Sequence, residues 1–225
     1  MSLTNVKDFE ELLKIIPKSV IDKVWFFQIK QDRKNPDVSP GSILKGNTAY
    51  RLPRYEAISR LKWGKNIGIY ALTGGLMFLD LDVKDGKLIA SNGILDSLQS
   101  NPTLTIQTRN GGIQKYFLNT GEYNNKVIKE NGVPIGELRT DWYYVVSVGS
   151  YVTPDEHSMT GDGTYILVGN NRIINQFEGF PGVLKRDEVK TEEIKISNQQ
   201  EAESISLQNY NLLLESKGKQ RRQVK

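Results

Sequence analysis

With 225 residues, no cysteine and one histidine, the chain excludes disulfides, cysteine-based zinc sites and histidine-rich metal sites. Any bound metal would depend on carboxylates and water, which favours Mg²⁺, Mn²⁺ or Ca²⁺. The length suits one large domain or one domain with an appendage, and the net charge of +4 suits a nucleic-acid partner among many others.

The sequence carries no signal for a membrane. No apolar run approaches the roughly 20 residues that a spanning helix needs, and the opening MSLTNVKDFEELLK lacks the pattern of a signal peptide. We therefore expect a cytoplasmic protein with no membrane partner.

The first third of the chain alternates helical and strand-like segments. Residues 8–16 predict an amphipathic helix that ends before Pro17, and residues 23–30 predict a strand. Residues 31–53 are polar and rich in proline, which is typical of a long functional or mobile loop. A helix is expected over residues 54–64, ending at a glycine.

The middle of the chain is rich in strand signals. A Thr-Gly-Gly turn separates the runs 66–72 and 76–83, and a short helix over 93–102 follows. Residues 104–120 read as two strands joined at Gly-Gly, a strong hairpin signal. Further strands are expected within 126–154 and 163–169.

A pair of carboxylates closes the apolar run LMFLDLD. Alternation along a strand puts Asp80 and Asp82 on the same face, where two like charges repel each other. Either the pair caps a solvated strand end before the turn at Asp85, or the two carboxylates share divalent cations.

Two other segments carry charge in strand-like contexts. Glu137 and Arg139 lie in GELR and form either a surface ion pair or a buried acid with its partner. Arg109 and Lys115 flank the Gly-Gly turn, which is either an ordinary hairpin with exposed cations or a phosphate-binding turn.

Taken in order, four segments resemble the primase–polymerase (Prim-Pol) domains of the archaeo-eukaryotic primase superfamily, of the plasmid and phage replication type. They are NIGIYALTGGLMFLDLD, TRNGGIQKYF, GELRTDWYYVVSVGSYVTP and TGDGTYIL, and the likeness covers roughly residues 25–170. The first family motif ends in Asp-x-Asp, matched by Asp80 and Asp82. The third is an acid followed by an arginine, an aromatic patch and a small residue, matched by Glu137, Arg139, Tyr143, Tyr144 and Ser150.

The resemblance implies a DNA primase and DNA polymerase that transfers nucleotides by a two-metal mechanism, in the replication of a plasmid or virus. Mg²⁺ or Mn²⁺ would be the cofactor, held by the catalytic acids Asp80, Asp82 and Glu137. The expected partners are a single-stranded DNA template, NTP or dNTP, and a helicase on a separate chain.

The resemblance also implies roles for basic and aromatic residues. The expected nucleotide-binding residues are Arg109, Gln114, Lys115, Arg139 and Ser150. The expected nucleic-acid contacts are Lys62, Trp63 and Lys65, through phosphates and base stacking. Tyr143 and Tyr144 are further stacking candidates, although core packing is the better expectation for at least one of them.

The sequence departs from the family pattern at the second motif, where Gln114 replaces a histidine that contacts the nucleotide phosphates. An amide donates a hydrogen bond but carries no charge. Arg109 or Lys115 could supply the charge instead, and His157 is either a substitute phosphate contact or a surface loop residue. The third acid is Glu137 where the family usually has aspartate, and no cysteine-based zinc stem can form.

Two alternatives to a polymerase stay open. The glutamine also fits a catalytically weakened or inactive relative that binds nucleic acid during replication. A metal-dependent nuclease is the other alternative, because an acid followed later by Glu-Leu-Arg loosely matches a nuclease pattern.

For the fold, the resemblance implies an α+β (α/β) domain. A mostly antiparallel, RRM-like sheet would carry the acids and pack beside a smaller α/β subdomain. The β-rich runs with few helices favour the same class independently. We place this domain at residues 1–185 and expect a charged helical appendage or a flexible tail over 186–225.

Overall fold

The computed structural model describes residues 4–29, 50–84, 86–153, 163–179, 183 and 185–186. The chain divides into two compact units, Met1–Val183 and Leu184–Lys225, and every element named below belongs to the first. Most of the loop expected over 31–53, together with Asp85, His157 and the appendage beyond Arg186, lies outside the described residues.

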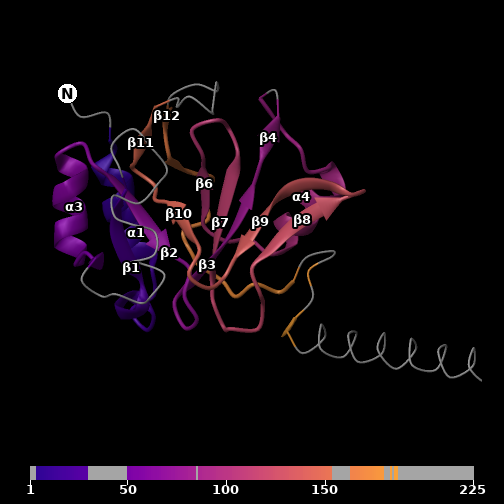
Figure 1. Ribbon diagram of the computed structural model, residues 1–225, viewed down its shortest axis with the longest axis horizontal. Helices are drawn as coiled ribbons and strands as arrows, with labels where there is room; N and C mark the ends of the chain where they lie inside the picture. Colours follow the sequence, from indigo (N-terminus) through magenta and orange to yellow (C-terminus); the bar gives the residue numbers. More distant parts are fainter. Residues whose placement is uncertain are drawn as a thin grey trace, which may run out of the picture. The chain divides into compact units, whose positions relative to one another are not determined.

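The first unit is a mixed α+β structure with antiparallel sheets and few helices, which confirms the predicted class (Figure 1). Its helical elements are α1 (Val6–Ile15), η1 (Ile21–Lys23), α3 (Arg54–Lys62) and α4 (Asn92–Ser100). Its strands are β1 (Trp25–Ile29), β2 (Asn66–Tyr70), β3 (Leu76–Leu81), β4 (Val83–Lys84), β5 (Lys87–Leu88), β6 (Thr105–Gln107), β7 (Ile113–Leu118), β8 (Lys126–Glu130), β9 (Val133–Arg139), β10 (Tyr144–Val146), β11 (Tyr151–Val152), β12 (Gly163–Thr164) and β13 (Ile166–Val168). None of the described helices is long and apolar enough to cross a membrane.

A small sheet of order β1-β2-β10 forms the first layer, with α1 and α3 beside it (Figure 1). The Asn5 side chain caps α1 by accepting a hydrogen bond from the Asp8 amide, and the helix ends at Ile15, before Pro17 as predicted. Gly68 at the centre of β2 leaves room for the Phe27 ring, because a Cβ there would lie 2.2 Å from that ring.

A larger antiparallel sheet of order β13-β6-β7-β3-β9-β8 forms the second layer. Alternation along β3 gives each face its own core. Leu76 and Phe78 pack with α1, α3 and the small sheet, whereas Met77 and Leu79 pack into a second core with residues of α4. Asp80 follows Phe78 on the face toward the small sheet, so the first core ends where the acids begin.

Both predicted glycine turns form, but only one of them joins strands that pair with each other. The Gly-Gly hairpin is confirmed, with β6 and β7 paired and the Thr108 amide donating to the Gly112 carbonyl at 2.8 Å. The Thr-Gly-Gly segment is also a turn, but β2 and β3 on its two sides join different sheets. This turn therefore carries the chain from one layer to the other.

Candidate active site

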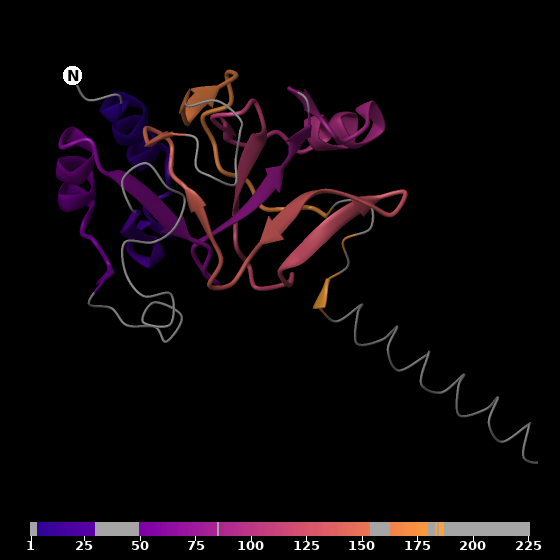
Figure 2. The same ribbon diagram turned by 45° about the horizontal axis from the view of Figure 1, so that its top comes forward.

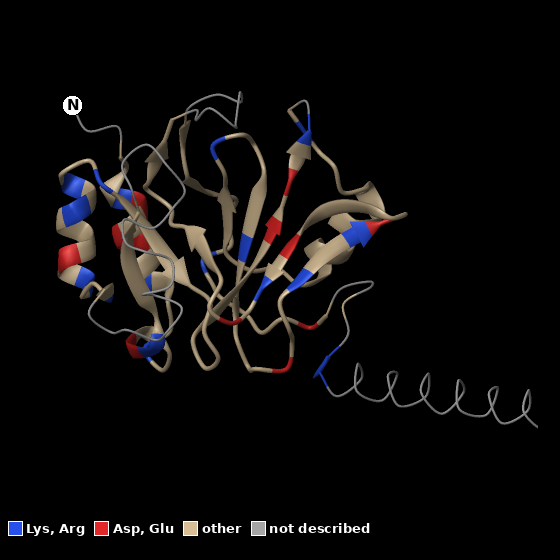
Figure 3. Ribbon diagram, in the orientation of Figure 1, with Lys and Arg blue, Asp and Glu red and all other residues tan. Residues whose placement is uncertain are grey.

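Three polar side chains meet at the centre of the larger sheet because the strand register places them in one row. Asp80 of β3 lies directly opposite Glu137 of β9 on one side and Gln114 of β7 on the other. Directly opposite residues in an antiparallel pair put their side chains on the same face, about 5 Å apart. Figure 3 shows the acidic positions of β3 and β9 side by side.

Arg139 compensates the charge of this row. Its Nη2 lies 3.3 Å from an oxygen of Asp80 and 2.9 Å from an oxygen of Glu137, so one guanidinium bridges both carboxylates. Its Nη1 donates to the carbonyl oxygen of Tyr144, which ties the larger sheet to β10 of the small sheet. The three charged side chains are 17–42% exposed, which leaves the site open to solvent.

Close packing of the two central strands keeps the carboxylates together. A Cβ on Gly136 would lie 2.2 Å from the backbone oxygen of Asp80, so only glycine lets β9 approach β3 this closely. Beyond the paired region, the amide of Asp82 donates to the Ile135 carbonyl at 3.0 Å. Asp82 itself is exposed and follows the last residue of β3.

Two buried tyrosines below the row were not identified from the sequence. Burial raises the pKa values of Tyr116 and Tyr165, and the negative charge of Asp80 raises both further. Both phenols therefore stay protonated next to the acid. Alternation gave a usable signal for Tyr116, which is two residues after Gln114 on the same face, but no local signal placed Tyr165 here.

Gln114 is the buried member of the row. It is 2% exposed, and its side-chain Oε1 has no hydrogen-bond partner among the described residues. A buried acceptor without a partner costs free energy unless a ligand or water supplies a donor or a cation. This atom is therefore a second indication, beside the carboxylates, that the row faces a ligand.

The two cations expected beside the Gly-Gly turn have different positions. Arg109 donates to the Thr153 carbonyl, and its charge acts on the Tyr165 pKa, so it borders the acidic row. Lys115 points to the opposite face, where its Nζ donates to the Leu98 carbonyl at the end of α4 at 2.9 Å, and burial lowers its pKa. The structure therefore does not bring Lys115 to the acids. The Gly111 amide donates to the Thr108 carbonyl, so it already has an acceptor within the turn.

Ser150 has a clear structural role. Its buried hydroxyl accepts from the Ile67 amide at 3.0 Å and donates to the Ile67 carbonyl at 3.2 Å. Asn66 makes a matching pair of bonds with the backbone of Tyr151. Together they fasten β2 to Ser150 and to the first residue of β11, and the Ser150 hydroxyl is turned toward this contact.

The residues expected to contact nucleic acid lie at the C-terminal end of α3. Lys62 is exposed, Trp63 is 72% exposed, and Lys65 is half-buried. Tyr143 is 52% exposed beside Glu137 in a small pocket of about 160 Å³, whereas Tyr144 is half-buried against Phe27 and Tyr70. Of the two tyrosines, Tyr144 is the one that packs into the core.

The donor set of the row consists of oxygen atoms, which is the chemistry that Mg²⁺ and Mn²⁺ prefer. Asp80, Glu137 and the Gln114 amide oxygen fit such an ion, and the exposed Asp82 lies two residues after Asp80 in the chain. Among the described residues, no group of three acidic or histidine side chains is arranged to hold a metal, and Arg139 forms ion pairs with two of the acids. A cation would therefore compete with the guanidinium for these carboxylates.

The sequence matches no protein-family model and none of the curated proteins with which it was compared.

Proposed function

We propose that the protein is a DNA primase and polymerase that adds nucleotides to a strand on a single-stranded template. The observation that carries the proposal is the row of Gln114, Asp80 and Glu137 on three adjacent strands, with Arg139 bridging the two acids. The two facing carboxylates and the Arg139 guanidinium between them are open to solvent, and such a group of charges suits the charge changes of phosphoryl transfer.

The strand order supports the same proposal. Four neighbouring strands of the larger sheet have the order β9-β3-β7-β6. In the chain, α4 lies between β3 and β6, and it packs on the face opposite the acids. This is the arrangement expected for an RRM-like sheet in which the first strand carries the acids. We therefore assign the larger sheet to that role and the small sheet with α1 and α3 to the smaller subdomain.

In this proposal, Asp80, Asp82 and Glu137 hold Mg²⁺ or Mn²⁺. When bound, these ions lower the pKa of the primer hydroxyl and neutralise charge on the triphosphate. Arg139 and Arg109 bind phosphate oxygens through their guanidinium groups, and the Gln114 amide binds without adding charge. Tyr116 and Tyr165 are buried uncharged phenols beside Asp80, and Lys62 and Trp63 contact the template.

A second candidate is a relative that binds nucleic acid without polymerising. It is favoured by one observation, the guanidinium that already bridges Asp80 and Glu137 at 3.3 and 2.9 Å. If that bridge persists when nucleotide binds, the acids remain unavailable for cations.

Nucleotide incorporation separates the two candidates. The purified chain is incubated with a primed and an unprimed single-stranded template, labelled dNTP or NTP, and Mg²⁺ or Mn²⁺. We expect extended products with the wild type and none with Asp80→Ala/Asp82→Ala. An inactive wild type that still binds the template favours the non-catalytic relative, and full activity of the double variant refutes the assignment of the acids. Incubation with plasmid DNA and Mg²⁺ tests the nuclease alternative.

A further inference from the structure

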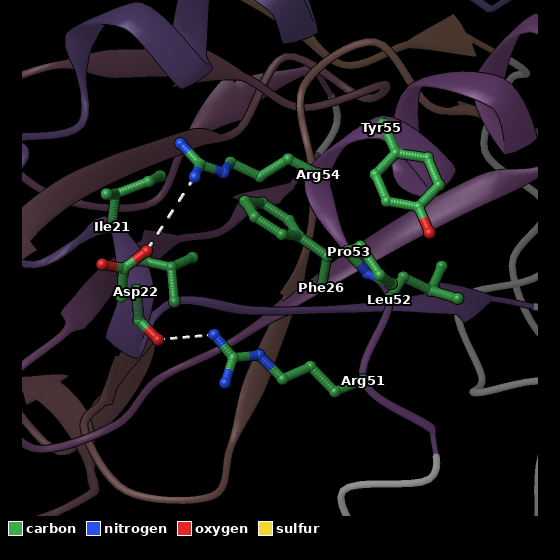
Figure 4. A pocket seen from close by; sticks show the side chains of 9 residues that line it. Ile21, Asp22, Phe26, Arg51, Leu52, Pro53, Arg54 and Tyr55 are labelled. Atoms are coloured by element: carbon green, nitrogen blue, oxygen red, sulfur yellow. Dashed lines mark hydrogen bonds and ion pairs between the residues drawn. The ribbon is translucent and has the colours of Figure 1, made fainter.

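A pocket of about 580 Å³ opens at the N-terminal end of α3 and shares no residue with the acidic row. Its inner wall is apolar, formed by Phe26, Leu52 and Pro53, and Figure 4 shows two arginines on either side of it. The volume lies in the range of small-ligand sites and is sufficient for one nucleotide unit.

The charges around this pocket favour an anion. Arg51 and Arg54 both line it, and Asp22 is the acid among its lining residues. The Arg54 guanidinium lies 3.9 Å from the Asp22 carboxylate, and these side chains are 55% and 88% exposed, so the ion pair is weak in water. Arg51 donates instead to the backbone carbonyl of Asp22. Two guanidiniums facing one exposed carboxylate leave an excess positive charge that suits a phosphate.

Aromatic rings border the same cations. Tyr55 at the rim is 72% exposed, and the Arg51 guanidinium lies 5.5 Å from the centre of the Trp25 ring. Trp25 in turn meets Trp142 edge to face, with ring centres 5.7 Å apart. Exposed aromatic rings beside arginines are the surface that stacks the bases of single-stranded nucleic acid.

The aromatic side chains continue from the pocket to the acidic row. Trp25, Tyr70 and Tyr144 lie directly opposite one another on β1, β2 and β10, and Trp142 packs on Trp25 and Tyr70. We call these four residues the aromatic strip. Tyr70 is 4% exposed and Tyr144 packs into the core, so Trp25, which is half-buried, and Trp142 are the rings of the strip that a base can reach. At its far end, the backbone carbonyl of Tyr144 accepts the hydrogen bond from Arg139, the residue that bridges the acids.

Trp142 occupies an unusual backbone conformation within the strip. Its φ is 58°, in the left-handed region that costs a bulky residue about 1 kcal/mol or more. Backbone bonds hold it there, because its amide donates to the Ala71 carbonyl at 2.9 Å and the Ala71 amide donates to the Tyr143 carbonyl at 2.7 Å. The ring remains 36% exposed rather than buried, which is consistent with a binding role.

We propose that single-stranded nucleic acid follows the aromatic strip and places a phosphate between Arg51 and Arg54, with a base against Tyr55. This inference rests on the proposed function, since it assigns the path by which the template leaves the acidic row. Adjacent strands lie about 4.8 Å apart, so the part of the aromatic strip on β1, β2 and β10 spans about 10 Å, and the pocket lies just beyond it. A single-stranded nucleic acid of a few nucleotides reaches from the acidic row to the pocket.

The test measures DNA binding alone, by fluorescence anisotropy of labelled dT12 with EDTA and without nucleotides, over a range of KCl. Each neutralised phosphate contributes about 0.7 to the salt slope of a single strand, so Arg51→Ala/Arg54→Ala, which frees one phosphate, is expected to lower that slope by about 0.7. Trp142→Ala is expected to weaken binding at least 5-fold with the slope unchanged, because stacking is uncharged. Asp22→Asn is expected to tighten binding.

Matched controls exclude a general charge effect. Lys84→Ala/Lys129→Ala removes two exposed positive charges outside the pocket and the aromatic strip, and is expected to leave the slope within 0.3 units, below the change of about 0.7. The milder variant Arg54→Gln keeps the Arg51–Trp25 contact and should lower the slope by less than the double variant does. Thermal unfolding of each variant shows that the fold is intact.

The outcomes separate this inference from the proposed function. An unchanged slope in both arginine variants, or equal losses in the lysine control, overturns the inference, as does a wild type that does not bind dT12. If binding follows the predictions but no nucleotide is incorporated, the proposed function fails alone. If templates are copied while the arginine variants bind normally, the inference fails alone.

Discussion

Replacing Arg139 with methionine tests the electrostatics of the candidate site most simply. The substitution removes the charge that lies 3.3 Å from Asp80 and 2.9 Å from Glu137, and it keeps much of the volume. Two carboxylates on directly opposite positions then lose this positive charge. At about 5 Å and an effective dielectric constant of about 20, their repulsion is about 3 kcal/mol.

Solvent reduces this value, because the side chains of Asp80 and Glu137 are 17% and 42% exposed. A repulsion of about 1–2 kcal/mol remains, and the hydrogen bond from Arg139 to the Tyr144 carbonyl adds about 1 kcal/mol. We expect Arg139→Met to lower the free energy of unfolding by about 2–3 kcal/mol. Adding Glu137→Gln should restore about 1–2 kcal/mol, since it removes the repulsion.

Urea unfolding followed by tryptophan fluorescence gives these differences at pH 7. Arg172→Met is the matched control, because Arg172 forms an exposed ion pair with Glu11 and should contribute less than about 0.5 kcal/mol. Mn²⁺ should stabilise Arg139→Met more than the wild type, because the ion can replace the guanidinium between the acids. A loss below about 0.5 kcal/mol, or a further loss on adding Glu137→Gln, would refute this reasoning.

Three further predictions concern the surroundings of the acids. Burial raises the pKa of Tyr116 above its ordinary value of 10.0, so the native phenol stays protonated where the unfolded one ionises. This group should not affect the free energy of unfolding below about pH 10. Above that pH it should lower the free energy of unfolding by up to about 1.4 kcal/mol per pH unit. Tyr116→Phe should remove this contribution to the pH dependence measured by urea unfolding between about pH 9 and 11. An identical slope in the variant would contradict this. Gly136→Ala should lower the free energy of unfolding by about 1–3 kcal/mol and reduce nucleotide incorporation, because its Cβ would lie 2.2 Å from the Asp80 carbonyl oxygen. The control Gly93→Ala, whose Cβ would have no neighbour nearer than 3.9 Å, should be neutral or stabilising. Equal effects of the two substitutions would contradict the close approach of β9 to β3. Gln114→His should raise incorporation, most strongly below pH 7 where imidazole is charged, and a variant less active than the wild type at every pH from 6 to 8 would show that the amide is the functional group.

Local signals in the sequence predicted much of the fold. Proline ended α1 at Ile15, and the Gly-Gly turn placed the β6–β7 hairpin, because both depend on the conformations of a few neighbouring residues. The turn between β2 and β3 was also predicted, but the separation of these strands into two sheets was not. A turn determines where the chain reverses, whereas long-range packing decides which strands pair.

The candidate site was predictable to a similar extent. Alternation predicts Asp80 and Asp82 on one face, and the same rule predicts Lys115 on the face opposite Gln114, where the structure has it. The bridge from Arg139 to Asp80 and the position of Tyr165 depend on contacts between strands far apart in the sequence. No local pattern specifies such contacts.

Nucleotide incorporation on a single-stranded template, compared between the wild type and Asp80→Asn/Asp82→Asn, tests the central proposal most directly. These substitutions keep the size of the side chains and remove the charges, and binding of dT12 in EDTA shows that the variant is folded and competent for DNA. We predict Mn²⁺- or Mg²⁺-dependent products from the wild type and a loss of at least 100-fold in the variant, as for the removal of a group that stabilises transition-state charge. Equal incorporation by the two proteins would contradict the assignment of Asp80 and Asp82 as the catalytic acids.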